Sequence, residues 1–198
     1  MRNLDLLPTG SKPAPAELAI VQGFVNTLNV ETGVDEIGTT ELLKAWLVRH
    51  GLQRSDVELT PKDLRTALSL REALRQLLLA NNGESIQPAE LGQINTLVSQ
   101  LKLAIQFKTD GALTFAPDSD GLAGVFEQIM ARIVEAVCDG TWFQLKACRE
   151  TGCQWAFYDS SKNHSGRWCS MSVCGSRDKA RAYRKRLSGK LPSSTSKR

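Results

Sequence analysis

Four cysteines near the C-terminus constrain this chain more than any other feature of its 198 residues. Cys148 and Cys153 enclose four residues, 15 residues follow, and Cys169 and Cys174 again enclose four. Two such pairs, a hairpin's length apart, suit four thiolates around one tetrahedral Zn2+ ion, although a two-residue spacing is commoner. Because four protein ligands leave no open position for water, we expect a structural ion and no catalysis at it.

Two disulfides, or four unrelated core thiols, are the alternatives for these cysteines. Disulfides belong to exported proteins, since thiols stay reduced in a cytosol. Residues 1–20 contain Asp5, Glu17 and three prolines in place of an apolar signal core. No stretch approaches the roughly 20 apolar residues that cross a bilayer. We therefore expect a soluble, cytoplasmic protein that does not contact a membrane. We expect the four thiols to bind a metal ion.

Charge divides the chain into two parts. Residues 1–139 hold 12 Lys and Arg against 18 Asp and Glu, whereas residues 140–198 hold 13 against 3. Four thiolates with one Zn2+ add −2 to the second part, which leaves it strongly basic. A basic appendage on an acidic domain is typical of proteins that bind polyanions, although a charged segment can also serve solubility alone.

The first part has the apolar periodicity of a helical domain. Thr39 or Thr40 is a candidate N-cap, and Thr60 followed by Pro61 and Asp63 is a strong helix start. Alternation around Thr109-Asp110-Gly111 predicts a β-hairpin at 103–115. The expected helices cover residues 17–29, 40–50, 61–80, 88–101 and 120–138.

The second part predicts a small finger. Residues 154–158 are expected to form a strand, 167–168 a return strand, and Ser176 the cap of a basic helix over 177–187. The expected fold class is mainly α: a helical domain with one hairpin (1–140), a zinc-ribbon or treble-clef-like finger (141–190) and a disordered tail (191–198). A finger this small cannot bury enough apolar surface alone, so metal binding and folding should be coupled.

Several residues have more ordinary interpretations. Cys138 is expected to be a small buried residue on an apolar helix face, and His164 a turn residue, since four thiolates already complete a zinc shell. His50 precedes Gly51 and is expected to cap a helix or lie at the surface. Seven of the twelve aromatic residues lie in the last third, where packing around the metal is favoured over stacking on bases.

The sequence from Arg167 through Cys169 and Cys174 to Arg177, together with the upstream cysteine pair, resembles the CGNR zinc finger. That motif usually ends with Asn where this chain has Ser176, a position that is not a ligand. Residues 24–28, 42–47 and 63–75 are similar to the ABATE domain that accompanies this finger. The resemblance implies a bacterial stress-induced transcription regulator with four zinc-binding cysteines and a DNA-binding finger.

The leading hypothesis is therefore a zinc-dependent DNA-binding transcription regulator that is not an enzyme. Arg177 and Arg181 are expected to contact bases, and the other helix cations phosphates. A protein-interaction module with a zinc clip is the runner-up. A small-molecule sensor is the third hypothesis, with Asn26 and Arg71 as pocket residues, and a homodimer is a further option. The expected nucleic-acid-binding residues are Arg177, Lys179, Arg181, Arg184, Lys185 and Arg186.

Overall fold

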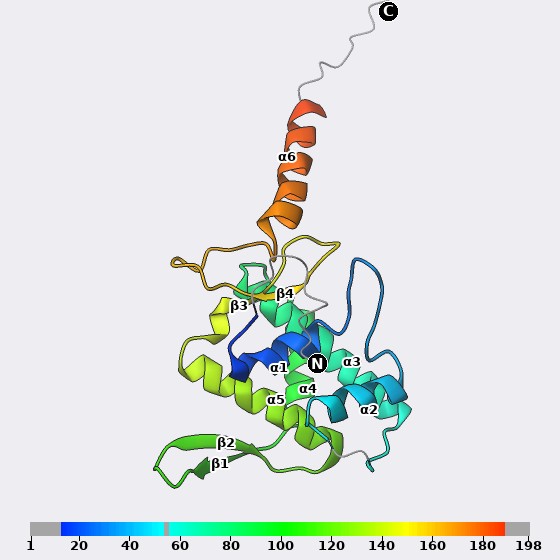
Figure 1. Cartoon of the computed structure of the whole chain (residues 1–198), viewed down its shortest axis with the longest axis vertical. Helices are drawn as coiled ribbons and strands as arrows, with labels where there is room; N and C mark the ends of the chain where they lie inside the picture. Colours follow the sequence, from blue (N-terminus) through cyan, green and yellow to red (C-terminus); the bar gives the residue numbers. More distant parts are fainter. Residues whose placement is uncertain (1–12, 54–55, 189–198) are drawn as a thin grey trace, which may run out of the picture.

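A computed structural model describes residues 13–53 and 56–188 (Figure 1). Five helices form the N-terminal body, and a two-stranded hairpin lies at the end of this body that is remote from the C-terminal helix. The helices of the body are α1 (Ala16–Val25), α2 (Thr40–Arg49), α3 (Pro61–Asn81), α4 (Pro88–Val98) and α5 (Gly121–Cys138). Together with the finger and its helix, they confirm the mainly α fold class.

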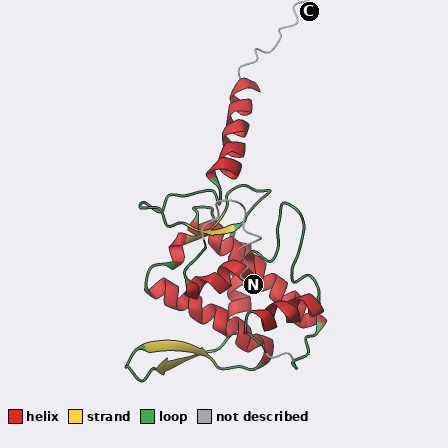
Figure 2. Ribbon diagram, viewed as in Figure 1, coloured by secondary structure: helices red, strands yellow, loops and turns green. Residues whose placement is uncertain are grey.

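The finger follows directly in the chain. Its elements are a short 3-10 turn η2 (Trp142–Gln144), strands β3 (Leu145–Ala147) and β4 (Ala156–Tyr158), a π-turn η3 (Met171–Gly175) and helix α6 (Ser176–Ser188). β3 and β4 pair antiparallel beside the helical body, and α6 extends away from it along the longest axis (Figure 2).

Capping explains where two of the helices begin. Thr39 caps α2 and accepts a hydrogen bond from the backbone N–H of Leu42. Thr60 and Asp63 form a reciprocal capping box at α3, with Pro61 in the first turn, where no N–H donor is required. These are the start signals that the sequence contains.

One apolar core joins the body to the finger. α1, α3 and α5 supply most of it, and Phe24 lies 5.6 Å from Trp46 and 6.4 Å from Phe126 between ring centroids. Leu145, Ala147 and Ala156 of β3 and β4 belong to the same core. The start of the finger is therefore packed into the helical body.

The predicted hairpin is present as β1 (Leu103–Phe107) and β2 (Leu113–Pro117). Its register pairs Ile105 with Phe115 and Phe107 with Leu113. The root of the hairpin is held by Glu127 of α5, which is fully buried and accepts hydrogen bonds from the backbone of Lys102, Asp118 and Ser119 at 2.8–2.9 Å. Burial opposes ionisation of Glu127, but these donors together lower its pKa.

Four sequence expectations are wrong in detail. α1 ends at Val25 and α4 at Val98, both short of the expected ends. Residues 167–168 form no strand: β4 pairs with β3, whose Leu145 and Ala147 lie in the core, and the carbonyl of Arg167 accepts from the N–H of Arg149 at 3.1 Å. Cys138 is exposed, because its position on α5 is opposite to Ile129 and Ile133. The tail predicted at 191–198 lies outside the described residues.

Candidate metal centre and basic helix

The four cysteines predicted as ligands are buried and converge on one point. Their Sγ atoms all lie within 4.8 Å of one another. Cys169 Sγ is 3.6 Å from Cys153 Sγ and 3.8 Å from Cys174 Sγ. A disulfide bond requires about 2.05 Å, so these contacts are not disulfides. Four sulfurs around one zinc ion at about 2.3 Å lie about 3.8 Å apart, which the contacts match.

The pKa values of the four thiols also indicate that a cation is needed at this point. Hydrogen bonds from Cys153 and Cys169 lower the pKa of Cys148 to about 2, so one thiolate forms readily. The pKa of Cys174 rises to about 12 because of its burial and the neighbouring charge of Cys148. Hydrogen bonding to Cys148 and burial likewise raise the pKa values of Cys153 and Cys169. Four thiolates can therefore coexist only if a cation compensates them.

Backbone amides point to the sulfurs of the first cysteine pair. The N–H groups of Glu150 and Cys169 point to Cys148 Sγ, and that of Trp155 points to Cys153 Sγ. Such donors stabilise a metal-bound thiolate. The described residues thus fit one structural zinc ion held by Cys148, Cys153, Cys169 and Cys174. When bound, zinc supplies a cross-link without redox chemistry.

Aromatic side chains shield this cluster. Trp155 and Phe157 are buried with the cysteines, and Trp168 packs against them. A Cβ on Gly175 would lie 3.2 Å from Trp168 Cδ1, so the ring leaves little room for a side chain here, whereas the exposed Met171, whose Sδ would be 2.6 Å away, can move aside. His164 makes its ring contact with the carbonyl of Asp159 at 3.0 Å and is a turn residue, as predicted.

A buried ion pair closes the loop between the two cysteine pairs. Lys146 Nζ donates to Asp159 Oδ2 at 2.8 Å and to the carbonyl of His164. Asp159 also accepts from the backbone N–H groups of Ser161 and Gly166. Burial opposes ionisation of Asp159, but these donors more than offset it and hold its pKa well below the ordinary range.

Replacing Asp159 by Asn is expected to lower the free energy of unfolding by about 3–5 kcal/mol, because Lys146 keeps a buried charge without its counter-ion. Urea unfolding measures this loss. Glu58→Gln is the matched control: Lys44 and Glu58 are also 2.8 Å apart, but Glu58 is 88% exposed. The control should change stability by less than about 1 kcal/mol.

The sign of the pH dependence follows from the lowered pKa of Asp159. A carboxylate whose pKa is lower in the folded state stabilises the protein above its unfolded pKa, and this contribution disappears as the pH falls through the folded value. The difference between wild type and Asp159→Asn should therefore stay constant between about pH 5.5 and pH 8. A difference that shrinks across this window would contradict an ionised Asp159.

Helix α6 carries the six predicted nucleic-acid-binding residues and a single acid, Asp178. From Arg177 to Leu187 every side chain except Asp178 is exposed. Arg177 pairs with Glu31 of the α1–α2 loop at 2.7 Å and lowers its pKa, and Arg181 pairs with the buried Glu150 beside Cys148. Of the two arginines expected to contact bases, Arg177 thus holds α6 to the body, and Arg181 holds it to the segment of the finger between Cys148 and Cys153.

The two expected pocket residues are buried and hydrogen-bonded. Asn26 exchanges two hydrogen bonds with the backbone of Ala156, at 2.8 and 3.0 Å. Arg71 donates to Asp35 at 2.7 Å, to Glu72 at 2.8 Å and to Thr27 at 3.3 Å. Asn26 therefore contributes to the contact between body and finger.

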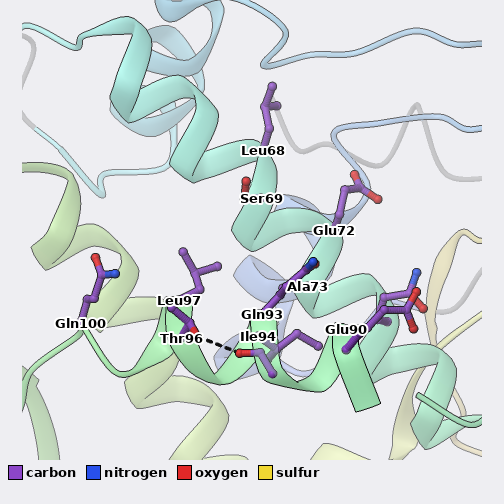
Figure 3. A pocket seen from close by; sticks show the side chains of 13 residues that line it. Leu68, Ser69, Glu72, Ala73, Glu90, Gln93, Ile94, Thr96, Leu97 and Gln100 are labelled. Carbon is purple, nitrogen blue, oxygen red and sulfur yellow. Dashed lines mark hydrogen bonds between the residues drawn. The ribbon is translucent and has the colours of Figure 1, made fainter. Parts of the chain in front are cut away.

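A cavity of about 1020 Å³ lies elsewhere, between α3 and α4 (Figure 3). Leu68, Glu72, Ile94 and Leu97 are among its lining residues, and neither Asn26 nor Arg71 is. Its charged lining residues, Glu72 and Glu90, are both acidic.

Sequence reasoning missed the residues that join the two parts. Arg75 is buried and donates to the carbonyls of Val25 at 2.8 Å and Gln154 at 3.0 Å. Asn82 donates to the carbonyls of Ala147 and Arg167 at 2.7 and 2.9 Å. For Arg75, the signal in the sequence was a charged residue among leucines. Such a pattern indicates a buried polar group but does not identify its partner.

Fold and site together define a zinc-finger protein with a helical N-terminal domain. Residues 18–140 match the ABATE family, whose description is "Putative stress-induced transcription regulator", and residues 144–187 match the CGNR zinc finger. The chain therefore belongs to the ABATE family and carries a CGNR zinc finger, as the sequence resemblance predicted. Neither match is to an enzyme family. Comparison with curated proteins finds no match.

None of the helices in the described part of the chain combines the length and the apolar character that a transmembrane span requires.

Proposed function

We propose that this protein is a zinc-dependent DNA-binding transcription regulator in which α6 contacts the duplex. The observation that carries the proposal is an exposed helix with six cations and one acid, attached directly to the zinc centre. Neutralising phosphates with such cations releases condensed counter-ions, which gives affinity without sequence readout. The family description supports a role in stress-induced transcription, and a cytoplasmic location agrees with reduced thiols.

The cations of α6 have two roles in this proposal. Lys179, Arg184, Lys185 and Arg186 contact phosphates. Arg177 and Arg181 orient the helix through Glu31 and Glu150, and the exposed Arg177 pair costs little to exchange for a DNA group. The side chains of Arg177 and Arg181 lie near the start of α6, where base contacts are expected.

Zinc has a positioning role. Cys174 is followed by Gly175 and then by the first residue of α6, so the ion fixes where the helix starts. An isolated helix of 13 residues is marginal in water, and α6 has no apolar face buried against the body. Its attachment to the metal centre and its contacts with DNA therefore supply the order that its own sequence does not.

Fluorescence anisotropy with a random-sequence duplex tests this function. The variant Arg184→Ala/Arg186→Ala should weaken binding and reduce the slope of log affinity against log salt by about 2, because two phosphate contacts are lost. Lys62→Ala/Arg65→Ala removes the same charge from an exposed face of α3 and should leave the slope unchanged. Equal effects of both variants would indicate general charge attraction and contradict a role for α6.

Two other functions remain as alternatives. In a protein-interaction module, α6 would bind an acidic protein surface, and the full-length protein would show no salt-dependent DNA binding. A small-molecule effector is favoured by the cavity between α3 and α4, whose volume is at the upper end of ligand sites. Occupancy of that cavity would regulate the DNA-binding function and would not replace it.

A further inference from the structure

Residues 159–167 form an exposed, basic loop between β4 and the second cysteine pair, which is named the finger loop below. Every residue from Ser160 to Arg167 except Gly166 is exposed. The cations of the finger loop are Lys162 and Arg167. Its one acid, Asp159, is buried and bonded to Lys146. The side chains that face solvent therefore carry positive charge and no negative charge.

Neither cation of the finger loop has an acidic partner within the described residues. Arg177 of α6, by contrast, pairs with Glu31, and Arg181 pairs with Glu150. An arginine that already pairs with a carboxylate must give up that contact in order to bind another anion. Lys162 and Arg167 can bind an external anion without such a loss.

The buried ion pair beneath the finger loop holds it in one conformation. Lys146 Nζ donates to Asp159 and to the carbonyls of His164 and Gly166. Asp159 accepts from the hydroxyl of Ser161 at 2.6 Å and from the N–H of Gly166 at 2.7 Å. The hydrogen bonds of this ion pair therefore connect the start, the middle and the end of the loop.

The end of the finger loop is also fixed to α3 and to the first cysteine pair. The carbonyl of Arg167 accepts from the N–H of Arg149 at 3.1 Å and from the side chain of Asn82 at 2.9 Å. A buried ion pair adds little net stability, so it does not by itself explain why an exposed loop is held so firmly. A loop that is fixed in advance loses less entropy on binding, which is what a binding surface requires.

The finger loop and α6 lie at the same end of the molecule. Figure 1 shows the loop beside the start of α6, at the end opposite to the β1–β2 hairpin. Between Arg167 and the first residue of α6 the chain passes through Cys169 and Cys174. Zinc bound by these two cysteines therefore also fixes the position of the loop relative to the helix.

We propose that the finger loop is a second DNA contact, in which Lys162 and Arg167 bind phosphates of the strand beside α6. This inference rests on the proposed DNA binding by α6 and adds a site outside that helix. A helix in the major groove is bordered by phosphate backbones, and in known DNA-binding folds a neighbouring element contacts them. Such contacts set the register and orientation of the helix without reading the sequence.

Salt-dependent binding of the zinc-bound chain to a random-sequence duplex tests this contact by fluorescence anisotropy. Lys162→Ala/Arg167→Ala should weaken binding and reduce the slope of log affinity against log salt by about 2, because two phosphate contacts are lost. Lys102→Ala/Lys108→Ala is the matched control: it removes the same charge from exposed positions at the hairpin and should leave the slope unchanged. Both variants should retain one zinc ion, since none of the four residues is a ligand.

Cleavage of the DNA backbone locates the loop on the duplex. Asn163→Cys in a Cys138→Ser background places an exposed thiol in the finger loop, and iron–EDTA attached there should cleave bound DNA. The same reagent on Thr109→Cys at the hairpin tip should not. A slope that falls for the α6 variant but not for the loop variant, equal effects of the loop and hairpin variants, or no cleavage from position 163 would overturn the loop contact alone. A chain without salt-dependent DNA binding would overturn it together with the proposed function.

Discussion

Removing zinc is expected to unfold the two segments that carry the cysteine pairs, residues 148–153 and 169–174. Helix α6 should then be released while the five-helix body persists. The chain should contain one zinc ion, and Cys169→Ser should lose it, because three thiolates no longer complete the shell. The apparent binding free energy of structural zinc in fingers is about 10–16 kcal/mol, far above the stability of an isolated small module. No other change considered for this protein has a larger expected effect.

Hydrogen exchange measures where order is lost. The amide of Cys148 donates to Trp155 and that of Arg149 to Arg167, both within the finger, and both should lose protection after chelation and thiol blocking. Amides in α3 and α5 should remain protected. Cys138→Ser provides the control, since this exposed thiol lies outside the cluster and its loss should leave the zinc content at one. Equal protection of the finger with and without metal would contradict the zinc-coupled fold.

Arg75→Met is also expected to destabilise the protein strongly, with a loss of about 2–6 kcal/mol in the free energy of unfolding, at about 1–3 kcal/mol for each of two buried carbonyls that lose their donor. The guanidinium group is 1% exposed and donates to Glu72 and to two backbone carbonyls, one in the body and one in the finger. Methionine fills the space of the side chain but leaves both carbonyls without a partner in the interior.

The carbonyl in the finger belongs to Gln154, whose φ of 49° is a conformation that non-glycine residues rarely adopt. Arg75 therefore stabilises a strained position directly after Cys153. Urea unfolding of Arg75→Met should be compared with Arg65→Met, an exposed arginine of the same helix, which should change stability by less than about 0.5 kcal/mol. Similar losses in both variants would show that α3 is destabilised generally and that the contact with Gln154 is unimportant.

Local signals in the sequence predicted much of this fold. Thr60 and Asp63 are three residues apart, and their capping box depends on no distant residue. The hairpin follows from strict alternation around a glycine turn, and the metal centre from two cysteine pairs whose spacing is set by coordination chemistry. Each of these features is defined by residues that are close in the chain.

Contacts between distant residues were not predictable in the same way. Asn26 and Ala156 are 130 positions apart, and Arg177 and Glu31 are 146 apart. The composition of α6 indicates a polyanion ligand, but it does not reveal that a carboxylate of the body engages Arg177 and a carboxylate of the finger engages Arg181. Likewise, alternation predicts that a hairpin has an apolar side, whereas only the packing of β2 on α5 determines that this side faces outward.

The way in which Asn26, Arg75 and Asn82 hold the finger has a consequence for its evolution. All three donate to main-chain carbonyls, and Asn26 also accepts from a main-chain amide. Peptide groups are identical whichever amino acids carry them. Mutations on the outer surface of the finger can therefore accumulate, and its ligand preference can diverge between relatives, without any matching change in the helices that support it.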